Sequence, residues 1–218
     1  TANEKLERQA THDPLTGLAN RHHFVERLTE TLANRKGRER IAVLFIDLNQ
    51  FKLINDTMGH SAGDRLLRCV ANHLKSAVGD GALLARMGGD ELTVIITCPE
   101  GHAPSDRARR FLDAFDAPFR VDQRTLNVGA SIGVVVEDGV SPTADLLRFA
   151  DTALYRSKAK GRGCLEVFDT AMRLELENRS LLADELYDAA TGGQLTTYLQ
   201  PIVDMSTGII HGAEALSR

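Results

Sequence analysis

The chain has 218 residues, 43% of them hydrophobic, so it can bury a substantial core as one domain or as one domain plus part of another. Its 26 Lys and Arg residues against 30 Asp and Glu give a net charge of −4, which excludes a broad electrostatic attraction to nucleic acid or anionic lipid. The longest apolar run, residues 41–46, is too short to span a membrane, and the 3 cysteines lack metal-ligand spacing. We therefore expect a cytoplasmic protein with reduced thiols, no direct membrane contact and only local phosphate binding.

Helices and strands alternate along the chain, and each is predicted from its apolar periodicity and flanking turn residues. In chain order we expect a helix from Asn20 to about Gly37, a strand at 41–46, a polar, turn-rich stretch to Gly63, a second helix, a hairpin of 83–87 and 92–96, a helix around 108–115, strands within 125–136 and a helix from Pro142 to about Lys160. Because a hairpin lies among them, the sheet cannot be wholly parallel. This favours an α/β fold with a mixed, mainly antiparallel palm-like sheet flanked by helices.

Acidic residues gather where two predicted strands end. Asp47 follows the first strand, and Asp90 and Glu91 follow Gly88 and Gly89 at the tip of the hairpin, where the missing glycine side chains let another molecule approach the backbone. Mg²⁺ takes one or two protein carboxylates together with substrate phosphate oxygens, so these acids predict a site for Mg²⁺ or Mn²⁺ and a phosphate. Each motif alone is explained equally well by a turn-capping Asp or by solvated hairpin acids, whereas their combination favours the metal site.

Four segments resemble the GGDEF family of diguanylate cyclases. They are Asp13-Pro14-Leu15-Thr16-Gly17-Leu18 with Asn20-Arg21, the run from Asp47 to Asp64, Arg86-Met87-Gly88-Gly89-Asp90-Glu91-Leu92, and Tyr155 to Arg162. Four motifs in the family's order are far more specific than any one of them. The resemblance implies a nucleotidyl-cyclase fold and the condensation of two GTP molecules into cyclic di-GMP and two pyrophosphates, by attack of a 3′-hydroxyl on an α-phosphate across a homodimer.

The resemblance also implies roles for individual residues. The metal ligands would be Asp47, the carbonyl of Leu48, Asp90 and Glu91, and Glu91 or Asp90 would also help to deprotonate the hydroxyl. The guanine readers would be Asn55 and Asp64. The remaining substrate contacts would be Lys52, Gly88, Gly89, Lys158 and Arg162. Asp64 has a simpler explanation as well, because an acid in the first turn of a helix complements the helix dipole. Cations such as Lys158 at a helix end are most often merely solvated.

Three departures from the family pattern stand out. Leu92 replaces the usual final Phe of the hairpin motif, an apolar change that we expect to alter packing without removing a ligand. Asn49 stands where Asp is common, and we expect its side chain to point away from Asp47 with little effect. Gly79 and Ala82 occupy the positions of an inhibitory Arg-x-x-Asp pair, so we expect the product-inhibition site to be absent.

We expect four segments in the chain. They are the end of a linker helix from an upstream sensory domain at 1–10, a GGDEF domain at 11–168, an amphipathic interdomain helix at 169–190 and the truncated start of an EAL cyclic di-GMP phosphodiesterase domain at 191–218. The resemblance to the EAL family implies a metal ligand in Glu214 and dinucleotide contacts in Gln200 and Arg218. The rest of that site is missing, so we expect no hydrolysis by this chain; the intact protein would carry the complete EAL domain.

Two other functions fit parts of the same pattern. The first is a regulatory module that binds GTP and adjusts an adjacent EAL domain without making product. The retention of Asp90, Glu91, Asn55 and Lys158 argues against this loss of catalysis. An adenylate or guanylate cyclase on a related palm is disfavoured by the guanine-reading run and the Gly-Gly hairpin. Competition between GTP and ATP separates the adenylate cyclase from the diguanylate cyclase.

Overall fold

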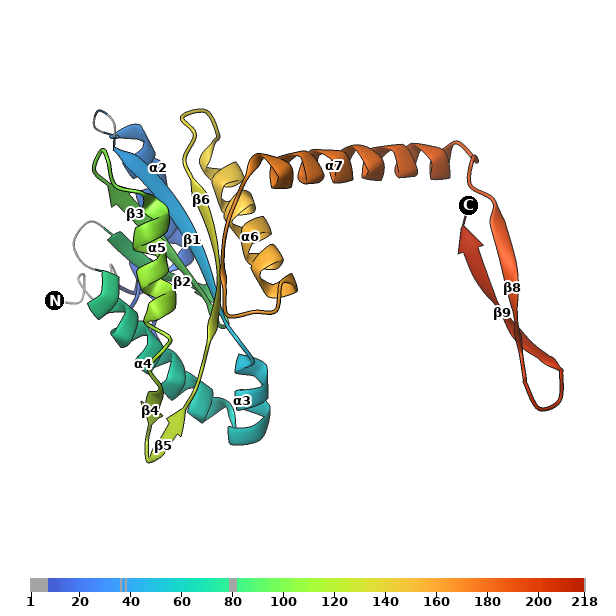
Figure 1. Cartoon of the computed structure of the whole chain (residues 1–218), viewed down its shortest axis with the longest axis horizontal. Helices are drawn as coiled ribbons and strands as arrows, with labels where there is room; N and C mark the ends of the chain where they lie inside the picture. Colours follow the sequence, from blue (N-terminus) through green and yellow to red (C-terminus); the bar gives the residue numbers. More distant parts are fainter. Residues whose placement is uncertain (1–7, 36, 38, 79–81, 218) are drawn as a thin grey trace. The chain divides into compact units, whose positions relative to one another are not determined.

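The computed structural model describes residues 8–35, 37, 39–78 and 82–217 (Figure 1). The chain divides into two compact units, Thr1–Asp169 and Thr170–Arg218. Most of the predicted linker segment 1–10, as well as Gly79 and Arg218, lies outside the described residues. None of the described helices is long and apolar enough to cross a membrane.

A five-stranded sheet with the order β2-β3-β1-β6-β7 forms the centre of the first unit. β1 pairs antiparallel with β3 and β6, β2 pairs antiparallel with β3, and β6 runs parallel to β7. The sheet is therefore mixed and mainly antiparallel, which confirms the predicted fold class. The strands are β1 (Arg40–Leu48), β2 (Ala82–Gly88), β3 (Glu91–Cys98), β6 (Ala130–Val136) and β7 (Leu165–Val167), and a separate ribbon contains β4 (Phe119–Val121) and β5 (Arg124–Leu126).

Helices cover both faces of this sheet (Figure 1). Alternate residues of β1, such as Leu44 and Ile46, join a buried cluster with residues of α4 and α5. On the opposite face, Gly133 of β6 lies so close to α6 that a Cβ atom there would overlap its backbone. The helices of this unit are α2 (Arg21–Ala33), α3 (Phe51–Met58), α4 (His60–Val78), α5 (Pro104–Asp113) and α6 (Thr143–Ala159).

The structure confirms the predicted start of α2 and corrects the region before Gly63. The Asn20 side chain accepts a hydrogen bond from the His23 backbone N–H at 2.9 Å, as expected of an N-cap. The stretch predicted to be turn-rich instead forms α3 and the first turn of α4, separated at Gly59, whose φ of 82° ends α3. The sequence pattern is misleading because α3 is short and buries only Phe51, so polar residues fill the rest of its surface.

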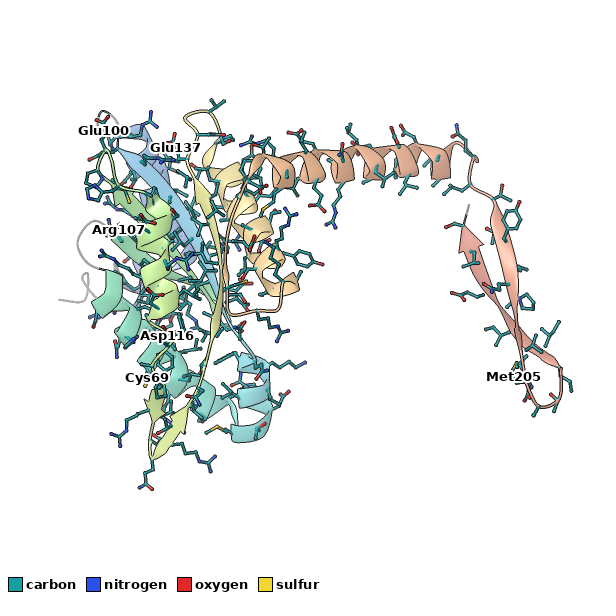
Figure 2. All side chains as sticks on the ribbon, in the orientation of Figure 1. Cys69, Glu100, Arg107, Asp116, Glu137 and Met205 are labelled. Atoms are coloured by element: carbon teal, nitrogen blue, oxygen red, sulfur yellow. The ribbon has the colours of Figure 1, made fainter. Side chains whose placement is uncertain are left out.

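The second unit contains α7 (Thr170–Thr191) and a hairpin of β8 (Thr197–Val203) and β9 (Ile210–Ser217). Every residue of both strands is exposed, and Met205 at the loop is 98% exposed (Figure 2). An isolated two-stranded hairpin is marginally stable in water. The hairpin's apolar side chains, among them Leu199 and Ile202, are thus available to further contacts.

Gly133→Ala tests the close packing of β6 against α6. The added Cβ overlaps the backbone nitrogen of Leu154 and the carbonyl oxygen of Ala150, so the helix must move. We expect the free energy of unfolding to fall by about 1–3 kcal/mol, measured by urea denaturation. Gly212→Ala is the matched control, because a Cβ on this strand glycine meets no atom within 4 Å. Equal stability of the two variants would contradict this packing.

Candidate functional site

The register of the central strands brings the predicted acids together. Asp47, one residue before the end of β1, is the Cα partner of Glu91 on β3 and of Ser131 on β6. Gly89 and Asp90 form the two-residue turn between β2 and β3, which confirms the predicted hairpin. The first strand and the hairpin tip thus meet at one edge of the sheet, as the acidic pattern predicted.

The acids in this region repel one another. Burial raises the pKa of Asp90 above the ordinary value for an aspartate, and the charge of Asp47 raises it further. Burial also raises the pKa of Glu91, and the charges of Asp151, Asp47 and Asp90 add to that effect. Asp151 on α6 is an acid that the sequence reasoning missed. It lies seven residues, or two helical turns, before Lys158, and this spacing is the signal that places both on one face of α6.

Lys158, predicted to bind phosphate, contacts a predicted metal ligand. Its Nζ lies 2.6 Å from Oδ2 of Asp47, and the side chains are 36% and 16% exposed. This lysine stands in the last turn of α6, where a cation also interacts favourably with the helix dipole. The contact neutralises one carboxylate of the cluster.

The donor set suits a hard divalent cation. Among the residues that the structure describes, no three His, Cys, Asp or Glu side chains are grouped so as to hold a metal by themselves. Mg²⁺ needs only one or two protein carboxylates when substrate phosphates supply further oxygens. Asp47, Asp90 and Glu91 fit that requirement, and burial together with neighbouring charges disfavours the ionised forms of Asp90 and Glu91. Leu48, with the predicted carbonyl ligand, follows Asp47 as the last residue of β1.

The predicted guanine readers lie on two consecutive helices. Asn55 belongs to α3 and Asp64 to α4. A Cβ atom on Gly63 would overlap Oδ1 of Asn55, so the amide lies against the backbone next to Asp64. The two predicted readers are therefore adjacent in space. Lys52 is exposed on the first turn of α3.

Two residues other than glycine adopt a left-handed backbone conformation, one just before α3 and the other just after α6. Gln50 has φ 61° between β1 and α3. Arg162, predicted to bind phosphate, has φ 65° in an exposed turn after α6, between Gly161 and Gly163, which also have positive φ. Such conformations are uncommon for residues with a side chain and concentrate at functional sites. The turn holds Arg162 in a conformation that its own side chain disfavours.

Arg86, Asp13 and Thr16 form a hydrogen-bonded clamp that supports the hairpin turn, and the sequence reasoning gave these three residues no role. Arg86 donates from Nε and Nη2 to the Gly89 carbonyl at 3.0 and 2.7 Å, and from Nη1 to both carboxylate oxygens of Asp13. Thr16 donates to Asp13 from its backbone N–H and hydroxyl. Burial alone would raise the pKa of Asp13, but the Thr16 and Arg86 contacts outweigh it, and the net shift is downward. The turn is thereby tied to the loop before α2.

Three of the residues that depart from the family pattern, Leu92, Asn49 and Ala82, lie in the described part of the chain. Leu92 is fully buried in the core at the start of β3. The backbone N–H of Asn49 donates to the Gly129 carbonyl at 2.8 Å, and its Oδ1 accepts from the Ser131 hydroxyl at 2.9 Å. Asn49 therefore joins the end of β1 to the start of β6. Ala82 begins β2.

The second unit contains the other predicted site residues. Gln200 on β8 and Glu214 on β9 are Cα partners in the antiparallel hairpin, and both are exposed. They lie side by side, which is compatible with a shared ligand.

Comparisons with known proteins agree with the resemblance in the first unit. The family described as "Diguanylate cyclase, GGDEF domain" matches residues 10–164. The chain is 36% identical to the cyclic di-GMP phosphodiesterase NbdA of Pseudomonas aeruginosa, covering 100% of this chain and 28% of that protein. It is 33% identical to the bifunctional diguanylate cyclase/cyclic di-GMP phosphodiesterase MucR of the same species, covering 100% and 32%. The chain thus spans less than a third of either relative's length.

Solved structures share the fold of the first unit. The GGDEF domain of TpbB, or YfiN, from Pseudomonas aeruginosa has a TM-score of 0.70 and 34% identity, and the match covers 76% of this chain and 99% of that one. The coiled coil and GGDEF domain of DgcB from Caulobacter crescentus, in complex with c-di-GMP, has a TM-score of 0.68 and 28% identity, covering 76% and 90%. The palm-like arrangement is therefore that of known GGDEF domains.

Asp90→Asn tests the repulsion among the acids. Because folding raises the pKa of Asp90, the charged carboxylate that dominates at pH 7 opposes folding. We expect the variant to resist urea better than the wild-type protein at pH 7 without metal or nucleotide. The difference should shrink as the pH falls through the raised folded-state value and vanish below the ordinary value of 3.8. Asp116→Asn, on an exposed loop, is the control, and a pH-independent difference would contradict the interpretation.

Proposed function

The chain belongs to the GGDEF family, and from that premise we propose that its first unit is a diguanylate cyclase domain. It would condense two GTP molecules into cyclic di-GMP and two pyrophosphates. The observation that carries the proposal is the alignment of Asp47 with Glu91 beside the Gly89–Asp90 turn. Phosphoryl transfer needs mainly positioning and charge stabilisation, and a cation held by the acids at this edge of the sheet would supply both.

Asp47, Asp90, Glu91 and the carbonyl of Leu48 would hold Mg²⁺ or Mn²⁺. The bound ion would neutralise phosphate charge and favour ionisation of the attacking hydroxyl. Either Asp90 or Glu91 would receive the proton of the 3′-hydroxyl as its oxygen attacks the α-phosphate and pyrophosphate leaves.

The surrounding residues would bind and orient GTP. A carboxylate at Asp64 would accept from the N1 and N2 donors of guanine, and the Asn55 amide would pair with the rest of that edge. Lys52, Lys158 and Arg162 would contact the phosphates through charge-assisted hydrogen bonds. Gly88 and Gly89 would let the phosphates approach the turn, which the Arg86 clamp holds in place.

The reaction requires two copies of the domain. One site holds one GTP, whereas the product contains two nucleotides, so we expect activity from a homodimer whose sites face each other. Residues 169–190 would connect this domain to an EAL domain that begins at 191–218. A cytoplasmic location, an upstream sensory domain and the absence of hydrolysis by this chain belong to the same proposal.

A regulatory GTP-binding module is the second candidate. It is favoured by the names of relatives such as NbdA and the Escherichia coli protein PdeR, both called cyclic di-GMP phosphodiesterases. In such a module the first unit would bind GTP and adjust a neighbouring EAL domain without forming product. Turnover separates the two candidates.

Product formation is the direct test. Concentrated protein is incubated with GTP and Mg²⁺, and cyclic di-GMP is measured by chromatography. We expect wild-type protein to form it and Glu91→Gln to reduce the rate by about 100-fold or more, because the variant loses both a metal ligand and a proton acceptor. Asp116→Asn should match the wild type. Near-normal product from Glu91→Gln would overturn the assigned role, and GTP binding without product would favour the regulatory module.

Asn55→Ala tests the guanine reader. The variant loses hydrogen bonds to the base and leaves the phosphate contacts unchanged, so we expect GTP affinity to fall about tenfold and ATP affinity to change little. Calorimetric titration with each nucleotide measures both affinities. Asn72→Ala, on the exposed side of α4, is the matched control. An equal loss for the two nucleotides would show that Asn55 does not read the base.

A further inference from the structure

The ion pair between Lys158 and Asp47 places an ammonium on a carboxylate that a metal would need. The 2.6 Å separation is that of a direct, charge-assisted hydrogen bond. The Asp47 side chain is only 16% exposed, so water screens this contact less than it screens a surface pair. A cation that binds at Asp47 therefore meets the charge of this ammonium on the same carboxylate.

Lys158 also acts on the rest of the acid cluster. Its charge opposes the upward pKa shifts of both Asp90 and Glu91. Arg86 is the other cation that opposes the shift at Asp90, but its guanidinium is held by Asp13 and the Gly89 carbonyl. Lys158 has a flexible four-carbon stem, so it is the cation better able to move when a ligand enters.

We infer that Lys158 and the divalent metal compete for the Asp47 carboxylate, so that metal and nucleotide bind cooperatively. The inference rests on the proposed function, because it takes the phosphates of GTP as the alternative partner of Lys158. Without nucleotide, metal binding breaks the ion pair and returns the ammonium to solvent. With nucleotide, the ammonium transfers to a phosphate oxygen and Asp47 is free for the metal.

Linkage makes this coupling measurable from both sides. If nucleotide raises the affinity for metal by some factor, metal raises the affinity for nucleotide by the same factor. A side chain that binds Asp47 in one state and phosphate in the other supplies the required difference between states. The device would keep the site from holding a metal ion before the substrate arrives.

The first measurement is Mn²⁺ binding to the nucleotide-free protein, followed by the electron paramagnetic resonance signal of the free ion. Lys158→Met removes the competitor, so we expect it to bind Mn²⁺ about fivefold more tightly than the wild type. Lys160→Met is the matched control: it removes the same charge two residues away, where Nζ pairs with Glu166 at 2.8 Å. It should behave as the wild type, whereas Asp47→Asn should weaken the binding.

The second measurement is the coupling itself. A GTP analogue with a methylene bridge between the α- and β-phosphorus atoms cannot release pyrophosphate, and its affinity is measured by calorimetry with and without Mn²⁺. We expect Mn²⁺ to tighten the analogue in the wild type and in Lys160→Met, and to do so less in Lys158→Met. Lys158→Gln is a second variant in case the methionine disturbs folding. Unchanged coupling in a folded variant would contradict the inference.

The outcomes separate this inference from the cyclase proposal. If the wild type makes cyclic di-GMP but Lys158→Met binds Mn²⁺ no more tightly, the competition is wrong and the cyclase stands. If Lys158→Met gains Mn²⁺ affinity while the wild type makes no product, the competition stands and the cyclase is wrong. Equal gains in Lys158→Met and Lys160→Met, or no Mn²⁺ binding by any variant, would overturn the competition.

Discussion

The antiparallel pairing of β1 with β3 is the constraint on which the candidate site depends. It places Asp47 opposite Glu91 and sets the hairpin turn beside the end of the first strand. The same register places Ile46 and Leu92 in the core, so a slip by one residue would turn apolar side chains outward. The same strand pairing therefore buries the core and places the acids. The free energy of core packing holds the carboxylates together despite their repulsion.

The site is stabilised from outside its ligand set. Arg86 fixes the Gly89 carbonyl and Asp13, and Lys158 neutralises Asp47. Crowded acids and a non-glycine residue at positive φ, such as Arg162, oppose folding, so other parts of the unit must offset them. This balance is expected where carboxylates are kept ready for a cation and a phosphate.

Much of the site follows from local sequence. The hairpin and the N-cap at Asn20 depend on neighbouring residues, and both agree with the prediction, although the two-residue turn is Gly89–Asp90 and Gly88 ends β2. The region before Gly63 does not, because the short α3 buries little and its polar surface resembles a turn. Asp64 and Asn55 were grouped by motif alone. Their adjacency appears only once α3 folds against α4 and the missing side chain of Gly63 makes room for the amide.

The sequence by itself determined the family, the mixed sheet and the acids that end β1 and begin β3. Only the tertiary structure decided what surrounds those acids: the ion pair between Lys158 and Asp47, the charge of Asp151 that acts on Glu91, and the hydrogen bonds by which Arg86 joins Asp13 to the turn. The physical reason is the distance along the chain over which each kind of interaction acts. Helix periodicity, turn chemistry and caps act over a few residues, whereas these contacts join segments far apart in the chain, and their distances are set by how α6 and the loop before α2 pack on the sheet.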